Sequence, residues 1–192
     1  MAHMTKNYRN LALMAAAAWI VVPIAWWLAA LLESDESGTG ITPFYVLGWA
    51  ALIGAGVLML LAMLRVGAAP GRTRLFQVGI ITHSLGILTS VVFFWAVPLW
   101  AGLYSIAMVF YAVAAPEVKR ATLVIAGAMA AGVASLVVLT ALQVGTPDTY
   151  GDYPIAWITS YVVAAFGGGV GSFLLAKDTA TAQEDIRVAM SS

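Results

Sequence analysis

The chain has 192 residues, of which 62% are hydrophobic and 9% charged, and its mean hydropathy is +0.93. This composition excludes an ordinary soluble domain, in which about a quarter of the residues are charged. Nine basic and nine acidic residues give a formal net charge of zero, and no extended basic face for nucleic acid is present. The lack of cysteine excludes disulfides and thiolate metal sites or nucleophiles.

Six apolar segments are long enough to cross a membrane, which requires roughly 20 residues for a hydrocarbon core of about 30 Å. We therefore predict an all-α, polytopic integral membrane protein that forms a single transmembrane domain with short loops. The predicted spans are residues 11–32, 42–64, 75–97, 99–116, 121–144 and 154–176. Residues 1–3, before a second methionine, are typical of a cloning remnant. The first span is too long for a removed signal peptide.

Prolines mark the expected helix ends in chain order. Pro43 suits the first helical position of the second span, and Pro70-Gly71 predicts a turn after that span. The third and fourth spans form a tight hairpin that turns near Pro98. From Asp178 onward the chain is polar, and we expect either one or two helical turns or disorder.

Every lysine and arginine falls on one side of the membrane when the six spans are threaded. These residues are Lys6, Arg9, Arg65, Arg72, Arg74, Lys119, Arg120, Lys177 and Arg187. Cytoplasmic loops hold Lys and Arg because these residues resist translocation. The pattern predicts that both termini are cytoplasmic. Arginine is favoured over lysine, which suggests a prokaryotic inner (plasma) membrane as the location.

His83 lies well inside the third predicted span, where ionisable side chains are uncommon and usually face the protein interior or a cavity. At 100° per residue its helix face holds only small or hydrogen-bonding residues: Gly79, Thr82, Gly86, Thr89 and Ser90. Lipid cannot satisfy this face, so it must meet other helices or water. Two interpretations stay open. Either His83 forms a hydrogen bond that joins neighbouring helices, or the face lines a cavity where His83 contacts a solute or relays a proton.

Three tyrosines are candidates for specificity groups beside this face: Tyr104 and Tyr111 in the fourth span, and Tyr161 in the sixth. If they converge on His83, the resulting pocket would suit a flat or partly polar molecule. The alternative for each tyrosine is a core position in which the hydroxyl is satisfied by a neighbouring carbonyl. The candidate ligand-binding set is Thr82, His83, Thr89, Ser90, Tyr104, Tyr111 and Tyr161.

No Asp, Glu, Lys or Arg lies near the middle of any predicted span. Carboxylates at membrane depth are the usual carriers of proton or sodium coupling, so antiport of that kind is disfavoured. One histidine without cysteine or carboxylate at the same depth is a poor metal site. No serine has an evident base and carboxylate partner. We therefore expect no enzymatic activity, no metal and no cofactor.

Small residues recur at four-residue spacing in the last two spans. Examples are Gly167/Gly171 and Gly168/Ser172 in the sixth span and Gly127/Ala131 in the fifth. Such pairs let helix backbones approach closely in lipid. We expect these residues to pack the fifth and sixth spans together. The alternatives are a docking site for another protein or a hinge.

Two functions follow from these observations. The first is a solute-binding transport component or small-solute pore, with a polar cavity around the third span. Six spans in fewer than 200 residues, with a small-xxx-small pair at Ala12/Ala16, are similar in size and span count to the substrate-binding subunits of energy-coupling-factor vitamin transporters. The second is a non-catalytic accessory, assembly or immunity-type subunit of a larger membrane complex. The expected partners are the lipid bilayer and either a small solute or another membrane protein, with the oligomeric state open.

Overall fold

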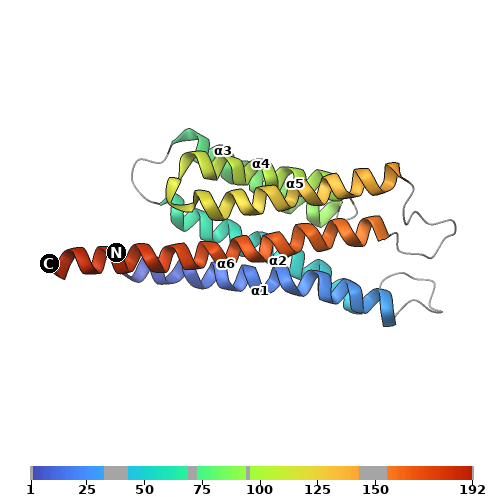
Figure 1. Ribbon diagram of the computed structural model, residues 1–192, viewed down its shortest axis with the longest axis horizontal. Coiled ribbons are helices and arrows are strands. Elements are labelled where there is room, and N and C mark those ends of the chain that lie inside the picture. The colour runs from blue at the N-terminus through green and yellow to red at the C-terminus, as the bar shows by residue number, and fades with distance from the viewer. Residues whose placement is uncertain (1, 33–42, 69–72, 94–95, 143–154, 192) are drawn as a thin grey trace.

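The computed structural model describes residues 2–32, 43–68, 73–93, 96–142 and 155–191, with side chains for 8–29, 43–68, 73–93, 96–142 and 159–178. All regular secondary structure in these ranges is helical (Figure 1). The elements are α1 (Ala2–Leu32), α2 (Pro43–Gly67), α3 (Arg74–Val92), α4 (Val97–Ala114), the 3₁₀ turn η1 (Pro116–Val118), α5 (Lys119–Ala141) and α6 (Ile155–Ser191).

Six of these helices are long and apolar enough to cross a membrane by length and composition. The prediction of an all-α fold with six such helices is confirmed. The protein is therefore a multi-pass membrane protein whose outer surface contacts lipid. Large apolar side chains cover that surface, including Ile81 on α3 at 61% exposed, Val113 on α4 at 64% and Phe166 on α6 at 68%.

Three helix ends differ most from the expected spans. Helix α1 begins at Ala2 rather than at 11. Helix α3 ends at Val92 rather than at 97, because Val97 and Pro98 already form the first turn of α4 and the chain must reverse before them. Helix α6 does not stop at 176 but continues to Ser191. Its polar extension contains neither glycine nor proline, the two residues that most disfavour a helix.

Successive helices run antiparallel (Figure 1). Their contacts close a ring in which each helix packs against two others. Helix α1 packs against both α2 and α6, α5 packs against α4 and α6, and α3 packs against α4. The contact between α2 and α3, which completes the ring, is the least extensive of the six. Both chain ends lie at the same end of the bundle (Figure 1).

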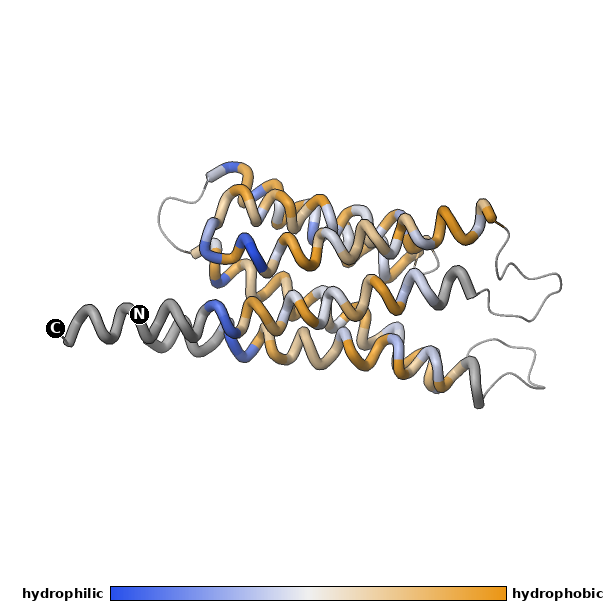
Figure 2. The backbone as a smooth tube through the Cα atoms, in the orientation of Figure 1, coloured by the Kyte–Doolittle hydropathy of each residue, from blue (hydrophilic) through white to orange (hydrophobic). Residues whose placement is uncertain are grey.

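Hydrophilic residues gather at the end of the bundle where the chain ends lie, whereas the rest of the helices is mainly apolar (Figure 2). This end, called the basic end below, carries the basic side chains that the structure describes: Arg9, Arg65, Arg74, Lys119, Arg120 and Lys177. The remaining basic residues, Lys6, Arg72 and Arg187, lie outside the described side chains. The described basic side chains therefore lie at one end of the bundle, as the sequence predicts.

Candidate functional site

His83 lies in the interior of the bundle with no exposed surface. Its Nε2 lies 3.1 Å from the Gly56 carbonyl oxygen of α2, and its Nδ1 lies 3.4 Å from the Tyr111 hydroxyl of α4. A carbonyl only accepts hydrogen bonds, so Nε2 carries the proton and Nδ1 accepts from Tyr111. One neutral imidazole thus joins α2, α3 and α4, and both of its nitrogens are used.

Aromatic rings from α4 enclose the imidazole. The Tyr104 ring stands edge-on to His83 with centroids 5.0 Å apart, and the Tyr111 ring lies 6.0 Å away. Both rings fit because α3 has glycine where they pack. A Cβ added at Gly79 would lie 2.8 Å from the Tyr111 ring, and one added at Gly86 would lie 3.2 Å from the Tyr104 ring. The small face of α3 is therefore filled by tyrosines.

The hydroxyl groups on this face of α3 bond to their own helix. Thr82 donates to the Val78 carbonyl at 2.9 Å, and Ser90 donates to the Ile87 carbonyl at 2.7 Å. Thr89 donates to carbonyls one turn earlier in the same way. Ser90 is fully buried, whereas Thr82 and Thr89 are only partly buried. These hydroxyls thus satisfy their hydrogen bonds inside α3, and no ligand is needed for that purpose.

The three candidate tyrosines occupy two separate places. Tyr104 and Tyr111 surround His83, whereas Tyr161 lies on α6 in contact with Trp26 and Trp100, at ring centroid distances of 4.0 and 5.7 Å. Trp100 in turn contacts Tyr104 at 6.0 Å. A continuous line of aromatic rings therefore links Tyr161 to the His83 environment.

Two tryptophans of this interior lie outside the predicted site. Trp100 is 1% exposed, although its place near a span end suits an aromatic belt at the membrane surface. Trp19 of α1 is 2% exposed and stands edge-on to Tyr104 at 6.2 Å. The spacing of Trp100, Tyr104 and Tyr111 places all three on one helix face and was the available signal for Trp100. For Trp19 the sequence offers no such signal.

Among the side chains that the structure describes, three buried polar atoms have no hydrogen-bond partner: Trp19 Nε1, Tyr104 Oη and Ser172 Oγ. Tyr104 faces Ser90 without reaching hydrogen-bond geometry. Trp19 packs on Gly168 of α6, one turn from Ser172. An unpaired polar group in an apolar interior is costly, so each of these atoms would be stabilised by a hydrogen bond that the described residues do not supply.

The predicted packing residues of α6 all contact neighbouring helices. A Cβ added at Gly167 would overlap the Ala128 side chain of α5, and one added at Gly171 would overlap Ile125 of α5. Gly168 instead contacts the Trp19 ring of α1.

On α5 the two predicted packing residues lie elsewhere. Gly127 and Ala131 are exposed, and a Cβ added at Gly127 meets no atom within 4 Å. The residues that follow each of them, Ala128 and Gly132, contact α6 instead. One residue turns a helix by 100°, and this separates the pair that contacts α6 from the exposed pair.

This arrangement can hold helices together through the hydrogen bonds of His83 and the close packing of small residues. No group of three His, Cys, Asp or Glu side chains that could hold a metal ion occurs among the described residues. Comparisons of the chain with protein-family models, curated proteins and solved structures find no match.

Proposed function

We propose that this protein is a non-catalytic subunit of a larger membrane complex and that one face of α5 binds a transmembrane helix of the partner. This face, called the α5 outer face below, consists of Gly127, Ala130, Ala131 and Ala134, all of which are exposed. The predicted orientation is kept, with the basic end in the cytoplasm of a prokaryotic cell.

The observation that carries the proposal is a gap in the large apolar side chains that cover the rest of the bundle. On α5, exposed large apolar residues occur at Leu123 and then at Val137, Val138 and Leu142. About 20 Å of helix between Leu123 and Val137 presents no such residue to lipid. Helices α3, α4 and α6 expose Leu, Ile, Val or Phe throughout the corresponding depth.

A smooth face of this kind favours contact with another helix. Lipid tails are as apolar as leucine, so helices associate in a membrane through close packing, and small residues allow that close packing. The chain already uses this device internally, where Gly167 of α6 meets Ala128 of α5. The α5 outer face has the same composition, and no helix among the described residues covers it.

The His83 geometry supports this proposal over solute binding at His83. A solute that contacts the imidazole would have to displace either the Gly56 carbonyl or the Tyr111 hydroxyl. Interhelical hydrogen bonds of this type hold membrane proteins together. We therefore assign His83 a structural role.

Site-directed crosslinking tests the proposal, and the chain suits the method because it contains no cysteine. Ala131→Cys, labelled with a photoreactive maleimide in membranes of the native host, should crosslink one partner protein. Leu88→Cys, at a position on α3 that is 57% exposed, is the matched control and should crosslink only lipid. Ala131→Phe should abolish co-purification of the same partner, whereas Val109→Phe on α4 should not.

Two outcomes would overturn the proposal. Equal crosslinking to lipid at Ala131 and Leu88 would show that the α5 outer face is an ordinary lipid-facing surface. A crosslink at Ala131 to a second copy of the chain would replace the partner subunit by a homo-oligomer.

A second candidate function, a solute-binding transport component, is favoured by the buried unpaired atoms Trp19 Nε1 and Ser172 Oγ. They offer hydrogen bonds to a small polar solute inside the bundle. Native mass spectrometry of the gently extracted protein should then detect a reproducible small mass. Trp19→Phe and Ser172→Ala should lose this mass. Ser135→Ala should retain it, because the Ser135 hydroxyl already donates to its own helix.

A further inference from the structure

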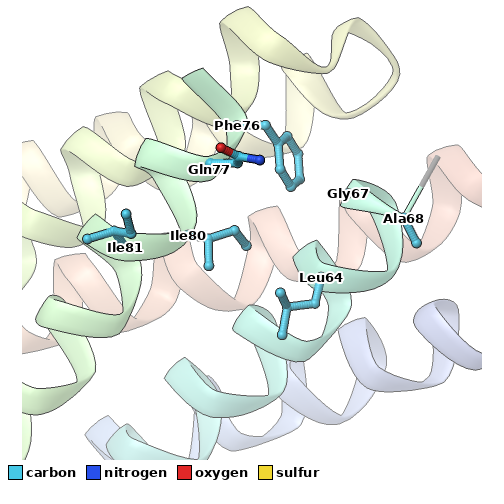
Figure 3. Close-up of a pocket in the computed structure, with 7 residues that line it drawn as sticks. All are labelled: Leu64, Gly67, Ala68, Phe76, Gln77, Ile80 and Ile81. Carbon is cyan, nitrogen blue, oxygen red and sulfur yellow. The ribbon is translucent and has the colours of Figure 1, made fainter. Parts of the chain in front are cut away.

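An open groove of about 490 Å³ lies between α2 and α3 at the basic end (Figure 3). Its volume falls within the range of roughly 300–1,000 Å³ that is typical of small-molecule sites. The lining consists of Leu64, Gly67, Ala68, Phe76, Gln77, Ile80 and Ile81. Leu64 is 46% exposed and Ile81 61% exposed, so the groove opens toward lipid.

The groove exists because α2 and α3 approach each other closely at only a few points. Near the basic end, Gly67 accepts the Phe76 ring, and a Cβ at Gly67 would lie 2.5 Å from that ring. Phe76 is 3% exposed and forms the inner wall of the groove. The lining is apolar except for the Gln77 amide, so a hydrocarbon chain matches it.

Two arginines lie close in the chain to residues that line the groove, one on each of its two helices. Arg74 is the first residue of α3. It lies on the same helix face as Gln77 and Ile81, which follow it by three and seven residues. Arg65, in the last turn of α2, directly follows Leu64 of the lining. Both arginines are exposed.

No nearby acid neutralises these arginines within the part of the chain that the structure describes. The carboxylates among its described side chains are Glu117, at the junction of α4 and α5, and Asp178 on α6. Neither Arg65 nor Arg74 forms an ion pair there. The first turn of α3 holds no acid and Thr73 gives no side-chain cap, so its free N–H groups add to the positive potential.

We infer that the groove binds an anionic phospholipid, with one acyl chain along the apolar lining and the phosphate between Arg65 and Arg74. Basic pockets between transmembrane helices at the cytoplasmic side suit such headgroups. A zwitterionic lipid fills the apolar part equally well but carries no net charge to pair with two arginines. The inference is independent of any partner at the α5 outer face, which belongs to a different helix.

Native mass spectrometry of the full chain can test this with two probes that share the same acyl chains, dioleoylphosphatidylglycerol and dioleoylphosphatidylcholine, added in equal amounts. Each arginine near an anionic lipid contributes about a fivefold preference, so two give about 25-fold for the anionic lipid. Arg65→Gln/Arg74→Gln should reduce the preference to near one. Lys119→Gln/Arg120→Gln removes the same charge at the same end of the bundle and should leave the preference intact.

A second pair of variants tests the groove itself. Ile81→Trp fills it and should lose the retained molecule of either lipid. Leu88→Trp is the control, because Leu88 lies two turns further along the same face and is 57% exposed. If the arginine variant unfolds, the same lipid competition is measured on the wild type at increasing ionic strength. The preference of the wild type for the anionic lipid should then fall, because salt screens the contact between the arginines and the phosphate.

Three results would overturn the inference. They are equal retention of both lipids by the wild type, an equal loss of preference in the Lys119→Gln/Arg120→Gln control, and undiminished retention by Ile81→Trp.

Discussion

Replacing His83 by alanine removes the polar connection between three helices, and its cost follows from the contacts described above. The change deletes two interhelical hydrogen bonds, which in a membrane protein average about 0.6 kcal/mol each. It also opens a cavity among the Tyr104 and Tyr111 rings, and large-to-small changes in a packed core add about 2 kcal/mol or more. We therefore expect His83→Ala to lower the free energy of unfolding by about 3 kcal/mol.

Reversible unfolding in mixed micelles, followed by tryptophan fluorescence, measures this loss. Tyr111→Phe removes only the longer of the two bonds and should cost about 0.6 kcal/mol. The double variant should then show a coupling energy of similar size. Ser84→Ala is the adjacent control, because Ser84 is exposed and its hydroxyl bonds within α3. A loss below about 1 kcal/mol for His83→Ala, or an equal loss for Ser84→Ala, would refute the structural role of His83.

Four further substitutions test the packing of the bundle by the same unfolding measurement. Gly167→Leu should cost about 2 kcal/mol or more because its side chain has no room against α5, whereas Gly102→Ala, where no atom lies within 4 Å, should be tolerated or stabilising. Trp49→Phe should lower the free energy of unfolding by about 0.6 kcal/mol, because it removes the 3.1 Å hydrogen bond to the Ser90 carbonyl. An unchanged free energy of unfolding would show that this bond does not stabilise the bundle. Tyr104→Phe should change stability by less than about 0.5 kcal/mol because its hydroxyl has no partner, and a larger loss would reveal one.

The fold was predictable because length and hydropathy dominate the behaviour of a membrane helix. Each of the six apolar segments contains enough residues to span a bilayer, and the protein has a long helix at each. The helix ends were less accessible. The reversal before Pro98 shortened α3, and the extension of α6 to Ser191 depends on helix propensity in a polar segment.

The surroundings of His83 were predictable only in part. The periodicity of α3 identified its small face, and Tyr104 and Tyr111 do meet it. The sequence left two interpretations of His83 open, a hydrogen bond between helices and a cavity for a solute. The choice between them depends on the distances from the imidazole to α2 and α4, and the periodicity of one helix carries no information about its neighbours. The same limit applies on α5, where the small-residue spacing fits Gly127/Ala131 and Ala128/Gly132 equally well. Only the rotation of the helix in the bundle separates the two pairs.

The limited contact between α2 and α3 has a mechanical consequence for the bundle. Five of the six pairs of neighbouring helices pack extensively, so the weakest junction in the ring lies between α2 and α3. Two hydrogen bonds, from His83 to the Gly56 carbonyl and from Trp49 to the Ser90 carbonyl, join α2 and α3 at this junction. A force that separates the helices sideways would meet its lowest resistance there. Helices α2 and α3 would then separate before the other neighbouring helices do.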